Sequence, residues 1–268
     1  MPSAHTMVDL HCHILPDMDD GSPSWDETLQ MAEIAVADGI SDIVCSPHQC
    51  DGFFNVEPRR VREAVTELAA RLKREGIDLR VHPGGDIRLQ PSLPDDLAAD
   101  RVNTIGDGGR YLLVELAPDL FPPGVEETFF ALRLRGYVPI LTHPERNAAI
   151  QAEVQVLESL VQAGVLLQVT AGAFTRRFGV DGRRCARRIA RRGWLHIVAS
   201  DAHDAEDRAP ALSEARRQVE TEYGVEVAEL AFCTNPSHVL AGGAVALENP
   251  PRPRPLENWC RRLLRTAR

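Results

Sequence analysis

The chain lacks several features that would assign it to a specialised class of protein. No apolar run approaches the ~18 residues that a membrane-spanning helix requires. The first residues, MPSAHTMVDLHCH, do not place an apolar segment after a basic one, so we predict neither membrane insertion nor a secretory signal. Aromatic residues make up only 5% of the 268 positions, but hydrophobic residues make up 44%, which suffices for a full aliphatic core. This balance excludes a disordered, collagen-like or coiled-coil chain.

Lysine is also scarce. The net charge is −9, and Lys73 is the single lysine. An acidic protein has little affinity for a nucleic-acid backbone or an anionic membrane surface, so we expect neither as a partner. The six cysteines include no Cys-x-x-Cys pair, and the chain is far longer than a disulfide-stapled scaffold. We therefore expect free, mostly buried thiols and a cytoplasmic location.

Two motifs that supply a catalytic nucleophile in other hydrolases are absent or misplaced. The Gly-x-Ser-x-Gly elbow of serine hydrolases does not occur. Cys185 and Arg191 have the Cys-x5-Arg spacing of cysteine-dependent tyrosine phosphatases, but that chemistry needs a loop of backbone N–H groups around a low-pKa thiolate. The segment between them has no glycine and follows the pattern of an amphipathic helix, so we attribute the spacing to chance.

Short apolar runs alternate with longer amphipathic segments along the chain. Seven runs are predicted strands, several of them continuously apolar as in strands buried on both faces: 8–11, 40–46, 79–84, 111–116, 138–142, 165–170 and 196–200. Five predicted helices each end before a glycine: 24–38, 58–75, 125–135, 153–163 and 183–192. This repeat predicts an α/β fold with a parallel sheet. The number of units favours a distorted seven-stranded TIM-like (β/α)7 barrel, with an open doubly wound sheet as the alternative.

The pattern continues without an internal linker, so we expect one domain over residues 1–248. Residues 249–268 are rich in proline and arginine and are predicted to form a strap and a short helix on the domain surface. The six arginines of this tail offer a contact to an acidic partner.

Candidate metal-ligating residues gather at the C-terminal ends of the predicted strands. They are His11 and His13 after the first strand, His48 after the second, Asp86 after the third, Glu115 at the end of the fourth, His143 after the fifth, and Asp201 and His203 after the seventh. In a β/α barrel these ends converge on the face where active sites form. Any one of them alone is more often an ordinary polar residue, but so many at one end indicate a shared site. The histidines at positions 5, 82, 196 and 238 fit the pattern less well, and we assign them structural or surface roles.

Imidazole and carboxylate ligands without thiolate favour manganese, iron or zinc. Their number exceeds one tetrahedral site, and a carboxylate can bridge two cations, so we expect two or three metals. Closely spaced cations activate water and hold both the attacking and the leaving oxygen of a displacement, which is hydrolytic chemistry suited to a phosphate ester. Arg146 and Arg208 lie a few residues after His143 and Asp201, and a guanidinium can hold phosphate oxygens in a bidentate manner.

Taken together, the motifs resemble the PHP (polymerase and histidinol phosphatase) domain, in particular the bacterial capsule and exopolysaccharide protein-tyrosine phosphatases of that superfamily. The resemblance begins with DLHCHILP at residues 9–16 and MDDG at residues 18–21. Further motifs follow in family order up to about residue 240: SPH (46–48), GGDIRL (84–89), LVE (113–115), THPERN (142–147), QVTAG (168–172) and ASDAH (199–203).

The resemblance implies a barrel of the PHP type with three metal ions, usually manganese. It implies that His11, His13 and Asp201 hold one metal, that Asp20, His48 and His203 hold another, and that Glu115 and His143 hold the third, with Asp86 shared between metals. Arg146 and Arg208 would then hold the phosphate. The implied reaction is dephosphorylation of phosphotyrosine on a cognate bacterial tyrosine autokinase that controls capsule or exopolysaccharide synthesis.

Two positions depart from the family pattern. Asp86 stands where the family usually has glutamate, and its shorter side chain requires either that the backbone moves inward or that one metal is held weakly. Gln49 stands where a second histidine often follows the Pro-His pair, which affects the rim of the site more than the metal ligands.

The expected mechanism is direct in-line attack by a metal-bound hydroxide, without a covalent phosphoenzyme, while the metals and two arginines stabilise the equatorial oxygens. Two alternatives stay open. One is another phosphoesterase on the same site, such as a histidinol-phosphate phosphatase or a nuclease, although the acidic charge disfavours the nuclease. The other is a catalytically silent scaffold that binds a kinase or regulator, and the departure at Asp86 keeps it open.

Overall fold

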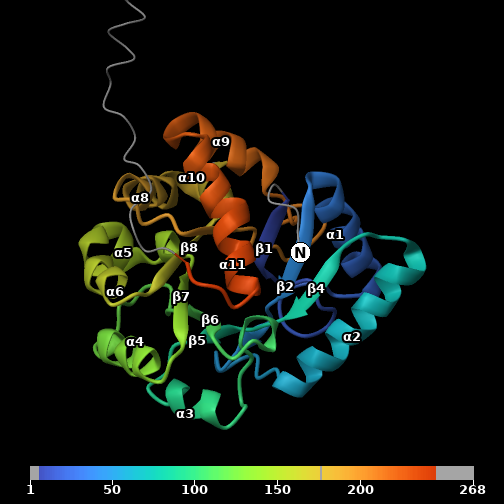
Figure 1. The fold of residues 1–268 in the computed structure, drawn as a ribbon, viewed down its shortest axis with the longest axis horizontal. Helices are drawn as coiled ribbons and strands as arrows, with labels where there is room; N and C mark the ends of the chain where they lie inside the picture. The colour runs from blue at the N-terminus through green and yellow to red at the C-terminus, as the bar shows by residue number, and fades with distance from the viewer. Residues whose placement is uncertain (1–5, 176, 246–268) are drawn as a thin grey trace, which may run out of the picture.

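The computed structural model describes residues 6–175 and 177–245 (Figure 1). Their strands pair in parallel and lie in two sheets. One sheet has the order β1 (Met7–Cys12), β2 (Ile40–Cys45), β4 (Arg80–Pro83). The other has the order β3 (His48–Gln49), β5 (Asp86–Arg88), β6 (Tyr111–Glu115), β7 (Val138–Thr142), β8 (Leu166–Thr170), β9 (Ile197–Ala199).

Seven of these strands correspond to the predicted segments, whereas β3 and β5 lie beyond the ends of the predicted segments 40–46 and 79–84 and were not predicted. β2 and β3 are separated at Pro47, which has no N–H group to continue a ladder. β4 and β5 are separated at Gly84 and Gly85. A Cβ added at Gly84 would lie 2.4 Å from Val44 Cγ1, and one added at Gly85 would lie 2.3 Å from Gln49 Oε1. The segment of β2 and β3 and the segment of β4 and β5 therefore approach each other at positions where only glycine fits. β2 pairs with β4 in one sheet, and β3 pairs with β5 in the other.

The predicted α/β fold with parallel strands is confirmed, but a closed seven-stranded barrel is not. The hydrogen-bonded ladders of the described residues form two sheets rather than one ring. β1 meets the segment after β9 at an isolated parallel bridge between Cys12 and Ala202. On its other side β1 pairs with β2, with register shifts between Met7 and Val8 and between Asp9 and Cys12.

Helices surround the strands (Figure 1). The longer ones are α1 (Trp25–Asp38), α2 (Pro58–Glu75), α4 (Val125–Leu134), α8 (Gly179–Arg191) and α9 (Ser213–Tyr223). The shorter ones are α3 (Leu93–Ala98), α5 (Ala148–Ala152), α6 (Glu158–Gln162), α7 (Ala171–Phe174), α10 (Val225–Glu229) and α11 (Asn235–Leu240). Single turns of other helical types are η1 (Ile105–Asp107), η2 (Pro144–Arg146), η3 (Val154–Leu157) and η4 (Leu230–Thr234).

The helix ends follow the local sequence. At the start of α1 the Ser24 hydroxyl accepts a hydrogen bond from the Glu27 N–H, and at its end Gly39 adopts a φ of +91°, which favours glycine. Four of the five predicted helices form with bounds shifted by at most four residues. The helix predicted over 153–163 is instead divided into η3 and α6, because the turn at Val154–Leu157 is a 3-10 turn.

The hydrophobic core has two parts that leave the C-terminal strand ends to polar residues. A smaller cluster takes side chains from six strands and includes Val8, Leu10, Val44, Leu113, Ile140, Leu166 and Ile197. A larger cluster joins the strands to the helices, as with Met31 of α1, Leu68 of α2 and Phe129 of α4. Since both parts are apolar, the buried polar side chains gather beyond them, at the end of the strands where the candidate ligands lie.

His82 and His196 have structural roles, as predicted. His82 Nε2 lies 2.9 Å from the buried carboxylate of Asp42. His196 is buried just before β9, and its Nδ1 accepts a hydrogen bond of 3.0 Å from the Leu167 N–H. Burial disfavours the imidazolium form and lowers the pKa of His196 to about 4. The imidazole is therefore neutral in the folded protein at every pH near neutrality.

Some expectations fall outside these residues. The predicted tail, 249–268, and His5 lie outside the described residues. Among residues 6–175 and 177–245, no helix is long and apolar enough to cross a bilayer. The five cysteines in this part of the chain are free thiols, and four of them are buried, as expected.

The depressed pKa of His196 predicts how stability depends on pH. The folded-state pKa is about 4 and the unfolded-state value is about 6.5, so the unfolded chain takes up a proton that the folded chain excludes. The contribution of neutral His196 is fully present above pH 6.5 and is lost as the pH falls towards 4, by about 2 kcal/mol between pH 7 and pH 5. We expect His196→Asn, which keeps an acceptor for Leu167, to remove this loss in urea unfolding of metal-free protein. An unchanged pH slope in the variant would contradict this assignment.

Candidate metal centre

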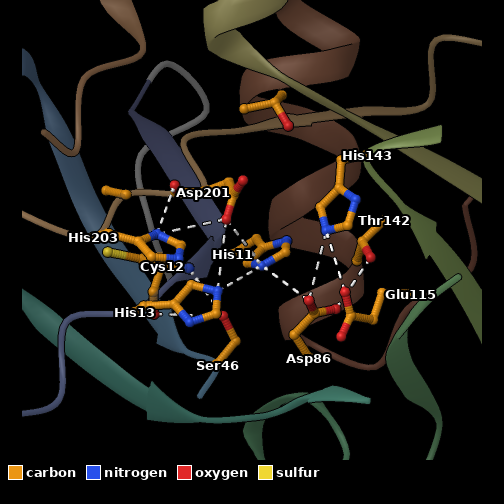
Figure 2. A network of polar contacts seen from close by, with 12 residues as sticks. His11, Cys12, His13, Ser46, Asp86, Glu115, Thr142, His143, Asp201 and His203 are labelled. Atoms are coloured by element: carbon orange, nitrogen blue, oxygen red, sulfur yellow. Dashed lines mark hydrogen bonds and ion pairs between the residues drawn. The ribbon is translucent and has the colours of Figure 1, made fainter. Parts of the chain in front are cut away.

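Side chains of the types that bind metals converge at the C-terminal ends of the strands (Figure 2). The nine residues predicted from the sequence all fall in four overlapping groups: His13, Asp20, His48 and His203; His11, Asp86 and His143; His11, His13 and Asp201; and His48, Asp86 and Glu115. Within each group the ligand-type atoms lie within 4.8 Å of one another. The geometric expectation that residues spread over the chain meet at one end of the strands therefore agrees with the structure.

One group forms a triangle around the end of β1. His11 Nε2 lies 3.1 Å from His13 Nε2. Asp201 Oδ1 lies 3.5 Å from His11 Nε2 and 3.6 Å from His13 Nε2. Ligand atoms that each lie about 2.0–2.2 Å from one cation are separated by about 3.0–3.6 Å. The triangle thus has the dimensions of one face of a coordination polyhedron.

Asp86 lies at the centre of the other groups. Its Oδ2 is 3.6 Å from the imidazole nitrogens of His11, His48 and His143. Within the described residues, Asp86 Oδ2, Glu115 Oε1 and His48 Nδ1 are all buried without a hydrogen bond of good geometry, although Glu115 Oε1 forms an ion pair with Arg88. Buried polar atoms without partners are costly, and divalent cations between them would satisfy all three. The donor set therefore fits bound cations.

The group that includes Asp20 lies nearest the solvent. Asp20 Oδ1 is 3.3 Å from His203 Nε2 and 3.5 Å from His48 Nε2, and its side chain is 50% exposed. His48 thus presents one ring nitrogen to Asp20 and the other to the buried carboxylates of Asp86 and Glu115. The four groups share several donors. Because one imidazole nitrogen binds one cation, groups that share a nitrogen could not each hold a separate cation.

The two departures from the family pattern have different consequences. Asp86, despite its shorter side chain, reaches three imidazoles, and its other oxygen accepts a hydrogen bond of 3.1 Å from the Thr142 hydroxyl. Gln49 is buried and belongs to none of the donor groups. Its amide group donates to Val56 O and to Asn103 Oδ1, each at 2.9 Å, and so holds the loop after β3.

Three side chains that support the donors were not predicted. Asp19 Oδ2 lies 2.6 Å from His13 Nδ1, and Gln168 Oε1 lies 3.0 Å from His11 Nδ1. Each of these oxygens can accept a hydrogen bond from the histidine Nδ1–H, which leaves Nε2 available to a metal and is a common support for ligating histidines. Arg88 Nη2 lies 3.1 Å from Glu115 Oε1. A ligating histidine needs a polar partner for its second ring nitrogen. Looking for such partners in the sequence would have pointed to Asp19 and Gln168.

Asp201 links the donor cluster to both predicted phosphate-binding arginines. Its Oδ1 faces His11 and His13, while its Oδ2 contacts Arg146 Nη1 and lies 2.8 Å from Arg208 Nη2. Both guanidinium groups line the same cavity of about 260 Å³, together with Asp20, His48, Arg88, Glu115, His143 and His203. The cavity therefore offers fixed positive charge beside the candidate cation sites.

Burial and neighbouring charges together set the protonation states of the cluster. It lowers the pKa of His13 to about 4, and it also lowers that of His11, so both imidazoles are neutral at pH 7 and able to bind a metal. Burial opposes ionisation of Asp86 and Asp201, but the neighbouring imidazoles, His11 above all, hold the pKa of each carboxyl well below its usual range. Burial also acts against protonation of His48, yet the adjoining carboxylates raise its pKa to about 10.

The chain matches known proteins over nearly all of the described residues. A family model described as "Capsular polysaccharide synthesis, CpsB/CapC" matches residues 7–241. The chain belongs to this family. Its relatives include the tyrosine-protein phosphatase YwqE of Bacillus subtilis, which is 36% identical over 92% of this chain and 96% of YwqE. The tyrosine-protein phosphatase CpsB of Streptococcus pneumoniae is 25% identical over 87% of this chain and 98% of CpsB.

Solved structures agree with the CpsB/CapC assignment. A crystal structure from work on YwqE of B. subtilis and CpsB of S. pneumoniae, which are described there as unique metal-dependent tyrosine phosphatases, superposes with a TM-score of 0.87. It is 36% identical in sequence and covers 92% of this chain and 99% of its own. A probable 2-pyrone-4,6-dicarboxylic acid hydrolase of Acinetobacter baumannii, 12% identical with a TM-score of 0.50 over 88% of this chain and 99% of its own, shares the fold alone.

The contact between Asp19 and His13 predicts a measurable effect on metal affinity. In Asp19→Asn the amide no longer provides the charge that fixes the proton of His13 on Nδ1, so we expect the affinity for Mn²⁺ to fall by about 10–100-fold. Isothermal titration of metal-free protein measures this change.

The matched control is Asp17→Asn, in the same loop but with an exposed side chain. The proposed role of Asp19 is rejected if both variants bind Mn²⁺ as tightly as the wild type.

Proposed function

We propose that this chain is a metal-dependent phosphatase that hydrolyses phosphotyrosine in proteins. The observation that carries the proposal is the juxtaposition, in one cavity, of buried donors without hydrogen-bond partners and two arginines held by Asp201. The names of the relatives, YwqE and CpsB, support the choice of phosphotyrosine among phosphate esters.

The residues assigned to the cations are those predicted from the sequence. One cation would be held by His11, His13 and Asp201, a second by Asp20, His48 and His203, and a third by Glu115 and His143, with Asp86 shared; His143 Nε2 and Glu115 Oε2 belong to different donor groups but lie 3.9 Å apart. Imidazole and carboxylate donors favour manganese, with iron or zinc as alternatives. Bound divalent cations supply Lewis-acid stabilisation of the phosphate oxygens and lower the pKa of water.

The chain's own residues bind and orient the substrate. Arg146 and Arg208 each use part of their fork of N–H groups on Asp201 and keep the remainder for phosphate oxygens. Phe178 lies under the Arg146 guanidinium, 4.9 Å from its carbon, and steadies it by a cation–π contact. The tyrosine phenolate has a pKa of about 10, so its departure requires little acid assistance.

A covalent cysteine intermediate has no support in the structure. Cys185, the cysteine of the Cys-x5-Arg spacing, lies buried within α8. Burial raises the pKa of its thiol to about 12, so the nucleophilic thiolate is not formed near neutral pH. Direct hydrolysis without a phosphoenzyme therefore remains the proposed route.

The proposed partner is a bacterial tyrosine autokinase in the cytoplasm that acts in capsule or exopolysaccharide synthesis. The family description, capsular polysaccharide synthesis, supports this setting. The net charge of −9 disfavours nucleic acid as a substrate.

The experiment that tests the function compares three substrates after chelation and after addition of Mn²⁺. We expect no turnover by the metal-free protein. With Mn²⁺, we expect a phosphotyrosyl peptide to have a kcat/KM at least ~100-fold above those of histidinol phosphate and single-stranded DNA, because phenolate leaves more readily than an alkoxide. Arg146→Lys keeps the charge but loses the fork, and should lower kcat/KM by about 10–100-fold.

Single turnover in ¹⁸O-labelled water provides the control on the route, with one labelled oxygen expected in the released phosphate. Turnover in excess chelator, a preference for histidinol phosphate or DNA, or a trapped phosphocysteine would each overturn the proposal.

A further inference from the structure

The exposed face of α8 carries a concentration of positive charge. A surface groove of about 480 Å³ is lined by five arginines of this helix: Arg183, Arg184, Arg187, Arg188 and Arg191. Its remaining lining is Gly179 and Val180, and the Val180 side chain is 73% exposed. No carboxylate lines this groove, although the chain has a net charge of −9.

Local ion pairs neutralise only part of this charge. Arg184 pairs with Asp181 at 2.9 Å, but both side chains are about two-thirds exposed, so the pair is weak. Arg183 and Arg187 share the single carboxylate of Glu222. Among the described residues, no carboxylate lies within ion-pair distance of Arg188 or Arg191. The groove therefore keeps a positive excess that an acidic ligand would offset.

The groove begins close to the candidate active site along the chain. Arg208 lines both the active-site cavity and a neighbouring hollow of about 90 Å³, which also reaches Arg177 and Phe178. Phe178 lies under the Arg146 guanidinium, and Gly179, the first residue of α8, already belongs to the arginine-lined groove. Glu214 is the acidic residue along the hollow. Basic side chains thus extend from the phosphate-binding arginines to the far end of α8.

We propose that this basic track, made of Arg177 and the five groove arginines of α8, binds an acidic segment of the phosphotyrosine protein while the phosphotyrosine occupies the cavity. The inference rests on the proposed function and adds a sequence preference to it. Carboxylates suit arginine forks, which bind them in a bidentate manner. α8 is about 18 Å long, which corresponds to about five or six residues of extended peptide. The acidic residues are therefore expected within about ten positions of the phosphotyrosine.

A peptide segment fits this track better than a membrane or a nucleic acid does. The groove starts at Gly179, the residue after the Phe178 that contacts Arg146, whereas a membrane surface or a long polyanion would also meet the net negative charge of the chain. These two ligands are therefore outcomes that the experiment must distinguish.

The test removes two exposed arginines from the track, as Arg184→Gln with Arg191→Gln. The matched control, Arg59→Gln with Arg74→Gln, removes two exposed arginines from α2, which lies on the opposite side of the molecule (Figure 1). Both proteins and the wild type are assayed with Mn²⁺ on p-nitrophenyl phosphate and on two series of phosphotyrosyl peptides. One series carries Asp or Glu on the N-terminal or the C-terminal side of the phosphotyrosine, and the other carries Gln at the same positions.

We expect the α8 variant to lose about 5–20-fold in kcat/KM on an acidic peptide, through KM rather than kcat, and this loss to shrink in high salt. Its activity on p-nitrophenyl phosphate and on the Gln peptides should stay within about twofold of wild type, as should all activities of the α2 variant. An equal loss on acidic and Gln peptides, or an equal loss in the α2 variant, would overturn the inference. The inference would also be overturned if the α8 variant bound phosphatidylglycerol vesicles or DNA more weakly than the wild type but hydrolysed acidic peptides equally well. If the wild type hydrolyses neither p-nitrophenyl phosphate nor any peptide, the proposed function fails first, and the inference falls with it.

Discussion

The contact on which the site depends is the burial of carboxylates among imidazoles at the ends of the strands. The carboxyl group of Asp86 is fully buried, and its Oδ2 lies 3.6 Å from three histidine nitrogens without a hydrogen bond from any described residue. Taking such charges out of water costs several kcal/mol unless other groups compensate. Five histidines and four acidic residues converge here at spacings that suit shared cations. In our account, bound cations offset the desolvation cost of the carboxylates that the fold buries here.

The parallel strands explain how distant residues reach one place. The strands pair in parallel, so their C-terminal ends face the same side, and the candidate donors lie at or just after several of these ends. Asp201 then couples the two halves of the site, because one carboxylate oxygen faces His11 and His13 while the other holds Arg146 and Arg208. The position of the phosphate-binding groups is thereby tied to the position of the candidate cations. α8 begins beside Arg146 and extends the positive charge outward from it.

Much of the fold and the donor set could be predicted because each depends on local patterns. Buried parallel strands are continuous apolar runs, and a histidine or acid that follows such a run lies at its C-terminal end whatever the rest of the fold does. The ligand sets implied by the family resemblance match the groups that the structure brings together around His13 and Asp201. The assignment of these residues to particular cations stays a prediction.

What was missed depends on contacts across the chain. Asp19 and Gln168 support histidines through side-chain contacts that no spacing reports. The short strands β3 and β5 were not predicted, because each follows a break, at Pro47 or at Gly84 and Gly85, and the hydrogen-bonded ladders form two sheets instead of the expected closed ring. The basic groove of α8 was likewise hidden, because abundant arginine along the whole sequence conceals which ones share a face.

Anomalous diffraction from crystals grown with Mn²⁺ tests the central claim most directly. The account predicts two or three manganese peaks at the ends of the strands, each within about 2.5 Å of donors from one of the groups, and one of them beside Asp86 Oδ2. A cavity without anomalous peaks at saturating Mn²⁺, or manganese bound only away from these histidines and acids, would contradict it.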